Sequence, residues 1–273
     1  MRKIPLEINC IDRCAPALEA GKTFFNTLCA ATDGSNQSVP WKINLIKKDI
    51  DIRKFSQQKS AKSRLVCAAN VFNEIYENIP HNSIEGLKRI TSNAAQLMDN
   101  LALEDASILT IEPGIPQSGR FISLLRKEFL RLGRIPASPC THAENCPLLL
   151  SEAKKRWCHF AHNTLNAPKE LKRLSEAAGI PKDRLVFSYL FTDNASRSEK
   201  TIKKEKNIRI ISDIFPLPVN RFGCYGCSDS GLILLAGEKN QIEKLSSGSI
   251  YKSVISNNLQ LDIKSNAIII NIH

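Results

Sequence analysis

The sequence predicts an α/β fold, and three features of the 273-residue chain support it. Up to about residue 136, short apolar strands alternate with amphipathic helices. Beyond about residue 184, consecutive strands predominate, as expected for a β-rich part added to an α/β layer. The 42% hydrophobic and 24% charged residues are typical of a globular protein with an ample core.

The first predicted elements are a strand over 6–11 and a helix over 16–28. Pro16 suits the first helical position, where its missing N–H costs nothing. Asp12 lies between the two elements. Rossmann-type folds use an acid at this point to bind a ribose, and an aspartate here can equally cap the helix, so both roles are open.

Apolar periodicity then predicts strands over 41–46, 65–69 and 107–111 and helices over 84–101 and 121–132, with a short extended piece over 135–137. Asn73 follows the second of these strands, at an edge where α/β sheets bind ligands; the start of a helix is the alternative. Glu112 and Gly114 follow the third strand in a proline-rich turn, which is either ligand-binding or purely structural.

The rest of the chain falls into two predicted segments after 1–136. Segment 137–178 carries clustered cysteines and basic residues, and segment 179–273 is a β-rich part that completes the sheet. Segment 179–273 has predicted strands over 184–191, 208–214 and 232–236. It also has a predicted basic hairpin tip over 197–209, a turn over 224–227 and a terminal hairpin over 259–272.

Three of the nine cysteines, Cys140, Cys146 and Cys158, fall within one short polar segment. Buried cysteines that pack as small hydrophobes are one explanation. A disulfide framework is disfavoured by the odd count and by a start that does not read as a secretory segment. Thiolates that hold a metal are the explanation we prefer.

The spacing favours an iron–sulfur cluster over zinc. Zinc sites usually place paired cysteines two to four residues apart, whereas the gaps here are five and eleven residues. Four thiolates hold an iron–sulfur cluster, and a proline after a ligand, as in Cys146-Pro147, occurs in such runs. The candidates for the fourth ligand are Cys227, Cys224, His142, His159 and His162.

The net charge of +11 favours a polyanionic partner such as nucleic acid. The candidate RNA-binding residues are Lys154, Lys155, Arg156, Lys172 and Arg173. An ordinary solvated helix face is the alternative. No apolar run is long enough for a membrane helix, and polar residues interrupt the apolar stretch at the start, so we expect a cytoplasmic protein without a membrane.

Four stretches resemble a known family. P-C-T-H-A-E-N-C-P-L followed by W-C-H-F, together with I-D-R-C-A-P-A-L-E-A-G, A-N-V-F-N-E-I and T-I-E-P-G-I-P-Q-S-G, is similar to the methyltransferase-like family of the small ribosomal subunit, which has mitochondrial and bacterial members. The resemblance implies a class I S-adenosylmethionine methyltransferase fold, a [4Fe-4S] site and a role in small-subunit maturation or translation.

The resemblance also implies site residues. Cys140, Cys146, Cys158 and Cys227 match the cluster ligands, and the matching cofactor positions are Asp12, Asn73, Glu112 and Gly114. In that fold a first strand and a glycine-rich loop precede the acid, but no G-x-G-x-x-G occurs here. We therefore expect a sheet without its first, central strand, and weak or absent S-adenosylmethionine binding.

The expected function is that of an iron–sulfur, methyltransferase-like factor, monomeric when free, that binds the ribosomal RNA of the small subunit. One alternative is an active rRNA methyltransferase, whose catalytic residues the sequence does not identify. The other is a zinc-stabilised RNA-binding module without catalysis.

Overall fold

The computed structural model describes residues 5–31, 41–50, 61–76, 84–150, 156–193, 205–255 and 259–272. Lys154, Lys155 and most of the predicted basic hairpin tip lie outside these ranges. Contacts divide the chain into two compact units, Met1–Gln58 and Lys59–His273. This division differs from the three predicted segments, because strands from all three pair within the second unit.

The first unit is one βαβ element. Strand β1 (Glu7–Asp12) and strand β2 (Lys42–Lys47) pair in parallel, and helix α1 (Ala15–Ala31) connects them. Asp12 is the last residue of β1, and its Oδ1 accepts a hydrogen bond of 2.7 Å from the N–H of Cys14, just before α1. The predicted strand, helix and strand are therefore confirmed, with bounds within three residues of those predicted.

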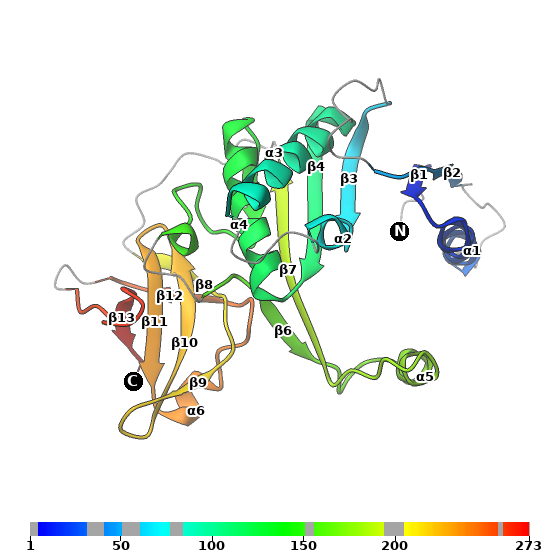
Figure 1. Cartoon of the computed structure of the whole chain (residues 1–273). Coiled ribbons are helices and arrows are strands. Elements are labelled where there is room, and N and C mark those ends of the chain that lie inside the picture. Colours follow the sequence, from blue (N-terminus) through cyan, green and yellow to red (C-terminus); the bar gives the residue numbers. More distant parts are fainter. Residues whose placement is uncertain are drawn as a thin grey trace. The chain divides into compact units, whose positions relative to one another are not determined.

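The second unit begins with a five-stranded sheet in the order β3-β4-β7-β5, with β6 beside β7 (Figure 1). Its strands are β3 (Ser63–Ala69), β4 (Ala102–Pro113), β5 (Ile135–Ser138), β6 (Phe160–Asn163) and β7 (Arg184–Asp193). β3 and β4 are parallel, whereas β7 runs antiparallel to β4, β5 and β6.

Each unit contains a parallel pair of consecutive strands. In a Rossmann-type sheet of order 3-2-1-4-5, the second and third strands pair, the fourth and fifth pair, and the first lies between the pairs. The pair β1 and β2 matches the former, and β3 and β4 the latter. Within the described ranges, no strand pairs with the other edge of β1 or of β3. The methyltransferase-like α/β fold is confirmed, and the missing first strand stays a prediction.

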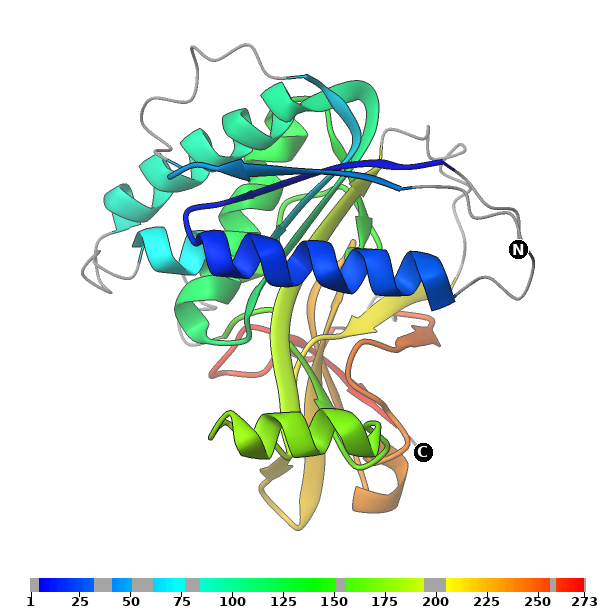
Figure 2. The ribbon, with the colours of Figure 1, turned by 90° about the vertical axis from the view of Figure 1, so that its right-hand side faces the viewer.

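Helices α2 (Phe72–Tyr76), α3 (Ile84–Leu101) and α4 (Pro116–Arg131) pack on this sheet; Figure 2 shows α3 and α4 from a second side. The core-facing side of α4 buries Phe121, Leu125 and Phe129 completely. α4 begins five residues before the predicted helix, because Pro116 lies in its first turn, where proline is favoured.

A second sheet forms the C-terminal part, in the order β12-β8-β10-β11-β13, with β9 beside β10. Its elements are β8 (Lys206–Ile210), β9 (Phe215–Leu217), β10 (Arg221–Ser228), β11 (Gly231–Gly237), α6 (Lys239–Ile242), β12 (Ile250–Ser253) and β13 (Ile268–Asn271). β10 is central and pairs with β8, β9 and β11.

One prediction for this part is wrong. Residues 224–227 form the middle of strand β10 and not a turn. The glycines there allow close packing: a Cβ at Gly226 would collide with the Ile208 side chain of β8. The predicted terminal hairpin forms in a short version. Leu261 and Ile268 make an antiparallel bridge, and the N–H groups of Asp262 and Ile269 donate to the carbonyls of Ala267 and Gln260, while β13 also pairs in parallel with β11.

Helix α5 (Lys169–Ala177) lies at the end of the arm formed by β6 and β7, and none of its residues is buried (Figure 1). None of the helices in the described part of the chain is both long and apolar enough to cross a membrane.

Candidate metal centre

Four cysteines from separate parts of the second unit line one hollow. Cys140 follows β5, Cys146 precedes a short 3-10 turn at Pro147–Leu149, Cys158 precedes β6, and Cys227 lies on β10. The hollow measures about 450 Å³, a value that includes space open to solvent. It therefore joins the predicted cysteine segment to the C-terminal sheet.

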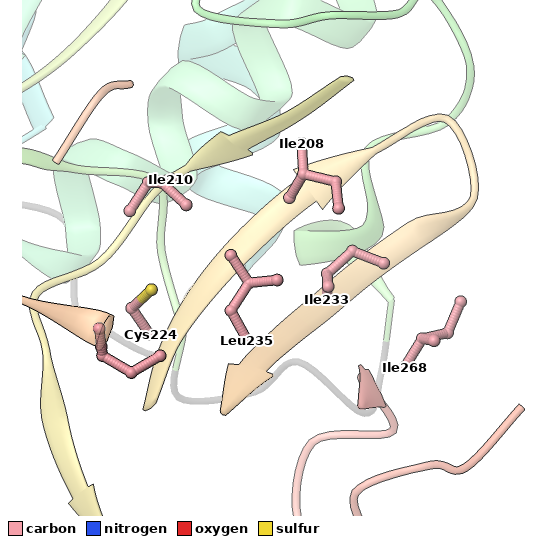
Figure 3. Packing of buried hydrophobic residues seen from close by; sticks show 7 residues of the cluster. Ile208, Ile210, Cys224, Ile233, Leu235 and Ile268 are labelled. Carbon is pink, nitrogen blue, oxygen red and sulfur yellow. The ribbon is translucent and has the colours of Figure 1, made fainter. Parts of the chain in front are cut away.

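Cys227 and Cys224 lie on opposite faces of strand β10. Side chains alternate between the two faces of a strand, so residues three apart on β10 point to opposite sides. Cys224 is fully buried among apolar side chains that include Ile208, Ile233 and Leu235 (Figure 3). Cys227 packs instead with Cys146 and Cys158 against a different apolar cluster. The structure thus brings Cys227, and not Cys224, to the other three cysteines.

Hydrogen bonds from side-chain hydroxyls to backbone carbonyls hold the cysteine segments in place. The Ser188 hydroxyl of β7 donates to the carbonyl of Cys158 at 2.7 Å. The Thr141 hydroxyl donates to the carbonyl of Asn207 in β8 at 3.1 Å. The first segment is therefore attached to the C-terminal sheet and the third to the first sheet.

The thiols are electrostatically coupled. Burial raises the pKa of Cys158 well above its ordinary value, and the nearby thiols of Cys140, Cys227 and Cys146 raise it further. The pKa of Cys227 is raised in the same way, first by burial and then by Cys146 and Cys140. The positive charges of Arg209 and Arg126 act in the opposite direction on Cys158 and Cys227, respectively. Ligation at this site would therefore be coupled to proton release.

Two arginines line the same hollow. Arg126 of α4 is 3% exposed, and its Nε donates to the Cys140 sulfur at 3.2 Å. Arg209 of β8 donates from Nε to the carbonyl of Pro139 at 2.8 Å. Cationic donors beside sulfur atoms favour thiolates over thiols.

The histidines proposed as alternative ligands are placed differently. Nε2 of His142, a buried residue, lies 3.5 Å from the Cys227 sulfur. His159 stacks on Trp157, and His162 stacks on Phe187. Neither His159 nor His162 lines the hollow.

The chemistry of these residues suits a metal or cluster that is held by four thiolates. Four sulfur atoms, apolar side chains and two cations line one hollow. As positioned, no group of three or more His, Cys, Asp or Glu side chains in the described ranges could hold a metal ion.

The turn between β4 and α4 supports this region through Trp157. The indole Nε1 donates to the Gly114 carbonyl at 2.9 Å. A Cβ at Gly119 would lie 2.7 Å from the Trp157 ring. Both glycines of the E-P-G-I-P-Q-S-G motif therefore make room for close contacts, and Trp157 links that turn to the adjacent Cys158.

Glu112 and Asn73 lie together at the start of α2. The buried Glu112 carboxylate accepts hydrogen bonds of 3.0 Å from the N–H groups of Phe72 and Asn73, and the Tyr76 hydroxyl donates to it at 3.4 Å. Burial raises the pKa of Glu112 to about 7, although these hydrogen bonds oppose the shift. Glu112 thus caps α2 from a neighbouring strand, a contact that single-strand patterns do not reveal. The cofactor role of Asp12, Asn73, Glu112 and Gly114 remains a prediction.

The described candidates for RNA binding fall in two places, the segment before β6 and helix α5. The Arg156 guanidinium lies 4.8 Å above the Tyr225 ring and lines a hollow together with Trp157, His159 and Phe215. Lys172 and Arg173 lie on the exposed helix α5.

The fold and this site define a methyltransferase-like α/β protein with a cysteine-lined candidate metal centre. The family model described as mitochondrial small ribosomal subunit Rsm22 matches residues 7–214, which is more than half of the chain. The protein therefore belongs to the Rsm22 family.

None of the curated proteins compared with this sequence matches it. One similar solved structure is a Bacillus halodurans C-125 protein that is provisionally described as a methyltransferase. It shares 10% identity with a TM-score of 0.31, over 69% of this chain and 83% of that chain. Similarity at this level does not by itself define a shared fold.

Proposed function

We propose that this protein is an iron–sulfur factor that binds the ribosomal RNA of the small subunit and assists maturation or translation of that subunit. Membership of the Rsm22 family supports the ribosomal part. The observation that carries the iron–sulfur part is the convergence of Cys140, Cys146, Cys158 and Cys227 on one hollow. Four thiolates are the usual ligand set of a [4Fe-4S] cluster.

The role we propose for the cluster is structural. A bound cluster would supply four covalent links between the protein segments that surround it. Cys140 and Cys158 are separated from Cys227 by the whole of β6, α5, β7 and β8. Closing so long a loop by ligation couples cluster binding to folding.

Anaerobic purification with iron, sulfide and zinc analysis and a visible spectrum tests this proposal. We expect about four irons and four sulfides per chain and a broad brown absorbance. One zinc without sulfide would replace the cluster with a zinc clamp. Protein without metal would remove the proposal.

Cys140→Ser provides the test of the structural role. Loss of one ligand is expected to lower the melting temperature of the metal-bearing protein and its yield in soluble form. Cys67→Ser is the matched control, because Cys67 lies on β3, outside the hollow. A Cys140→Ser protein as stable as the control would mean that the cysteines do not clamp the structure.

We also propose that S-adenosylmethionine binds weakly or not at all to this chain. The absence of a G-x-G-x-x-G loop from the sequence supports this, because that loop lets the backbone approach the cofactor. Calorimetric titration tests the proposal, and a micromolar dissociation constant would contradict it and favour an active rRNA methyltransferase.

RNA binding is proposed from charge and aromatic placement. Arg156 can contact phosphate, and Trp157, His159 and Tyr225 border a hollow where an unpaired base can stack. Binding to small-subunit rRNA fragments is best followed as a function of salt, because phosphate contacts produce a steep dependence. Equal affinity at low and high salt would contradict phosphate-based binding.

A further inference from the structure

The buried arginine Arg126 has an environment that apolar packing does not explain. It lies on α4 with 3% of its surface exposed. Its guanidinium donates to the carbonyls of His142 and Glu144, at 2.9 and 2.7 Å, and to the Cys140 sulfur. Among the described residues, no aspartate or glutamate side chain forms an ion pair with it. A buried cation without a counter-ion is strongly unfavourable.

Arg134 provides an internal comparison. It is also buried, at 6% exposure, and donates to backbone carbonyls such as that of Ala106. Unlike Arg126, it also forms an ion pair of 2.7 Å with Asp99. The same part of the fold thus contains one buried arginine that pairs with a carboxylate and one that donates to a cysteine sulfur.

Arg209 places a second cation at the hollow, from the opposite sheet. Its guanidinium bonds to the carbonyls of Pro139 and Gly248, and no carboxylate in the described ranges pairs with it either. Together, Arg209 and Arg126 hold both ends of the loop that contains Cys140 and direct two positive charges toward the four sulfurs.

We infer that Arg126 and Arg209 are the counter-ions of the occupied cysteine site and that the group held there carries a net charge of about minus two. Four thiolates around a doubly positive iron–sulfur core have this charge, as do four thiolates around one zinc ion. The inference rests on the proposed metal site but not on the identity of the metal. It makes Arg126 a positioning and charge-balancing residue and not a ligand.

The test compares three variants in the protein purified anaerobically with its metal. Arg126→Met removes both the positive charge and the N–H···S hydrogen bond. Arg126→Lys keeps the charge but loses the planar set of guanidinium N–H donors. Arg134→Met is the matched control. An iron chelator is added and the loss of visible absorbance is followed, or a zinc chelator is used if zinc is found. Charge-assisted hydrogen bonds to a buried anion predict loss about ten- to a hundredfold faster in Arg126→Met and an intermediate rate in Arg126→Lys.

A second measurement separates charge balance from general destabilisation. If the group is an iron–sulfur cluster, Arg126→Met is expected to lower its reduction potential, because nearby cations and N–H···S bonds favour the more negative, reduced state. Arg134→Met should leave the potential unchanged even if it weakens the fold.

Metal-bearing Arg126→Met protein that loses metal at the parental rate would overturn this inference and leave the proposed function intact. If Arg134→Met accelerated metal loss as much as Arg126→Met does, the inference would also be overturned, because the effect would then follow from fold stability alone. Parental protein that contains neither iron nor zinc would overturn both proposals.

Discussion

The turn between β4 and α4 offers a sharp prediction, through Gly114→Ala. A Cβ added at Gly114 would lie 2.8 Å from both the backbone nitrogen of Phe187 and the carbonyl carbon of Val186. These atoms belong to the central strand β7 and cannot move alone. The turn itself must therefore shift, and the hydrogen bond from Trp157 to the Gly114 carbonyl shifts with it.

Overpacking of this kind costs about 1–3 kcal/mol. In a unit of this size, each kcal/mol lowers the melting temperature by about 2–4 °C. A cost near 2 kcal/mol thus predicts a decrease of about 4–8 °C. The chain has two tryptophans, so a Trp41→Phe background makes Trp157 fluorescence report on the second unit alone.

Gly21→Ala is the matched control. Gly21 lies in α1 of the first unit, and nothing lies within 4 Å of an added Cβ there. Helical alanine is favoured over glycine, so this change is not expected to lower the Trp157 transition. If Gly114→Ala unfolds at the same temperature as Gly21→Ala, the close approach of this turn to β7 is refuted.

Three further predictions concern ligation, protonation and RNA. Cys227→Ser is expected to lose most bound metal, whereas Cys224→Ser should retain it and lose only packing; equal metal content by elemental analysis would contradict the assignment. The pKa of Glu112 is raised to about 7, above its unfolded value near 4.5, so the folded state binds this proton more tightly. The resulting stability is complete below about pH 4.5 and disappears as pH rises through 7. Relative to Glu112→Gln, the parent should lose about 3 kcal/mol between those limits in urea titrations, and parallel pH profiles would exclude this linkage. Charge reversal at Lys172 and Arg173 should weaken rRNA binding uniformly across sequences and reduce its salt slope by about one per lost phosphate contact, whereas an unchanged slope would place the RNA elsewhere.

Local patterns predicted the α/β part of the fold well. The strands and helices from β1 to β5 follow apolar periodicity. The start of α4 was missed because Pro116 resembles a turn residue as much as a first helical residue.

The error at residues 224–227 shows what the sequence could have revealed. Glycines at 223 and 226 suggested a turn, but in β10 they provide space for Leu217 and Ile208. Treated as a strand with a period of two, the same residues place Cys224 and Cys227 on opposite faces and allow only one of them to face the other cysteines. The contacts of Arg126, Arg209 and Glu112 could not be predicted in this way, because each joins elements far apart in the chain.

The placement of the cysteine hollow gives the proposed cluster its structural meaning. Its lining comes from α4, which packs on the first sheet, and from β8 and β10, which belong to the second. Arg126 and Arg209 approach it from these two sides and hold one loop between them. A group bound by all four cysteines would therefore connect the two sheets of the second unit through ligands and counter-ions together. Metal loss should then loosen the C-terminal sheet from α4 before either sheet unfolds, which hydrogen exchange on β8 and α4 can detect.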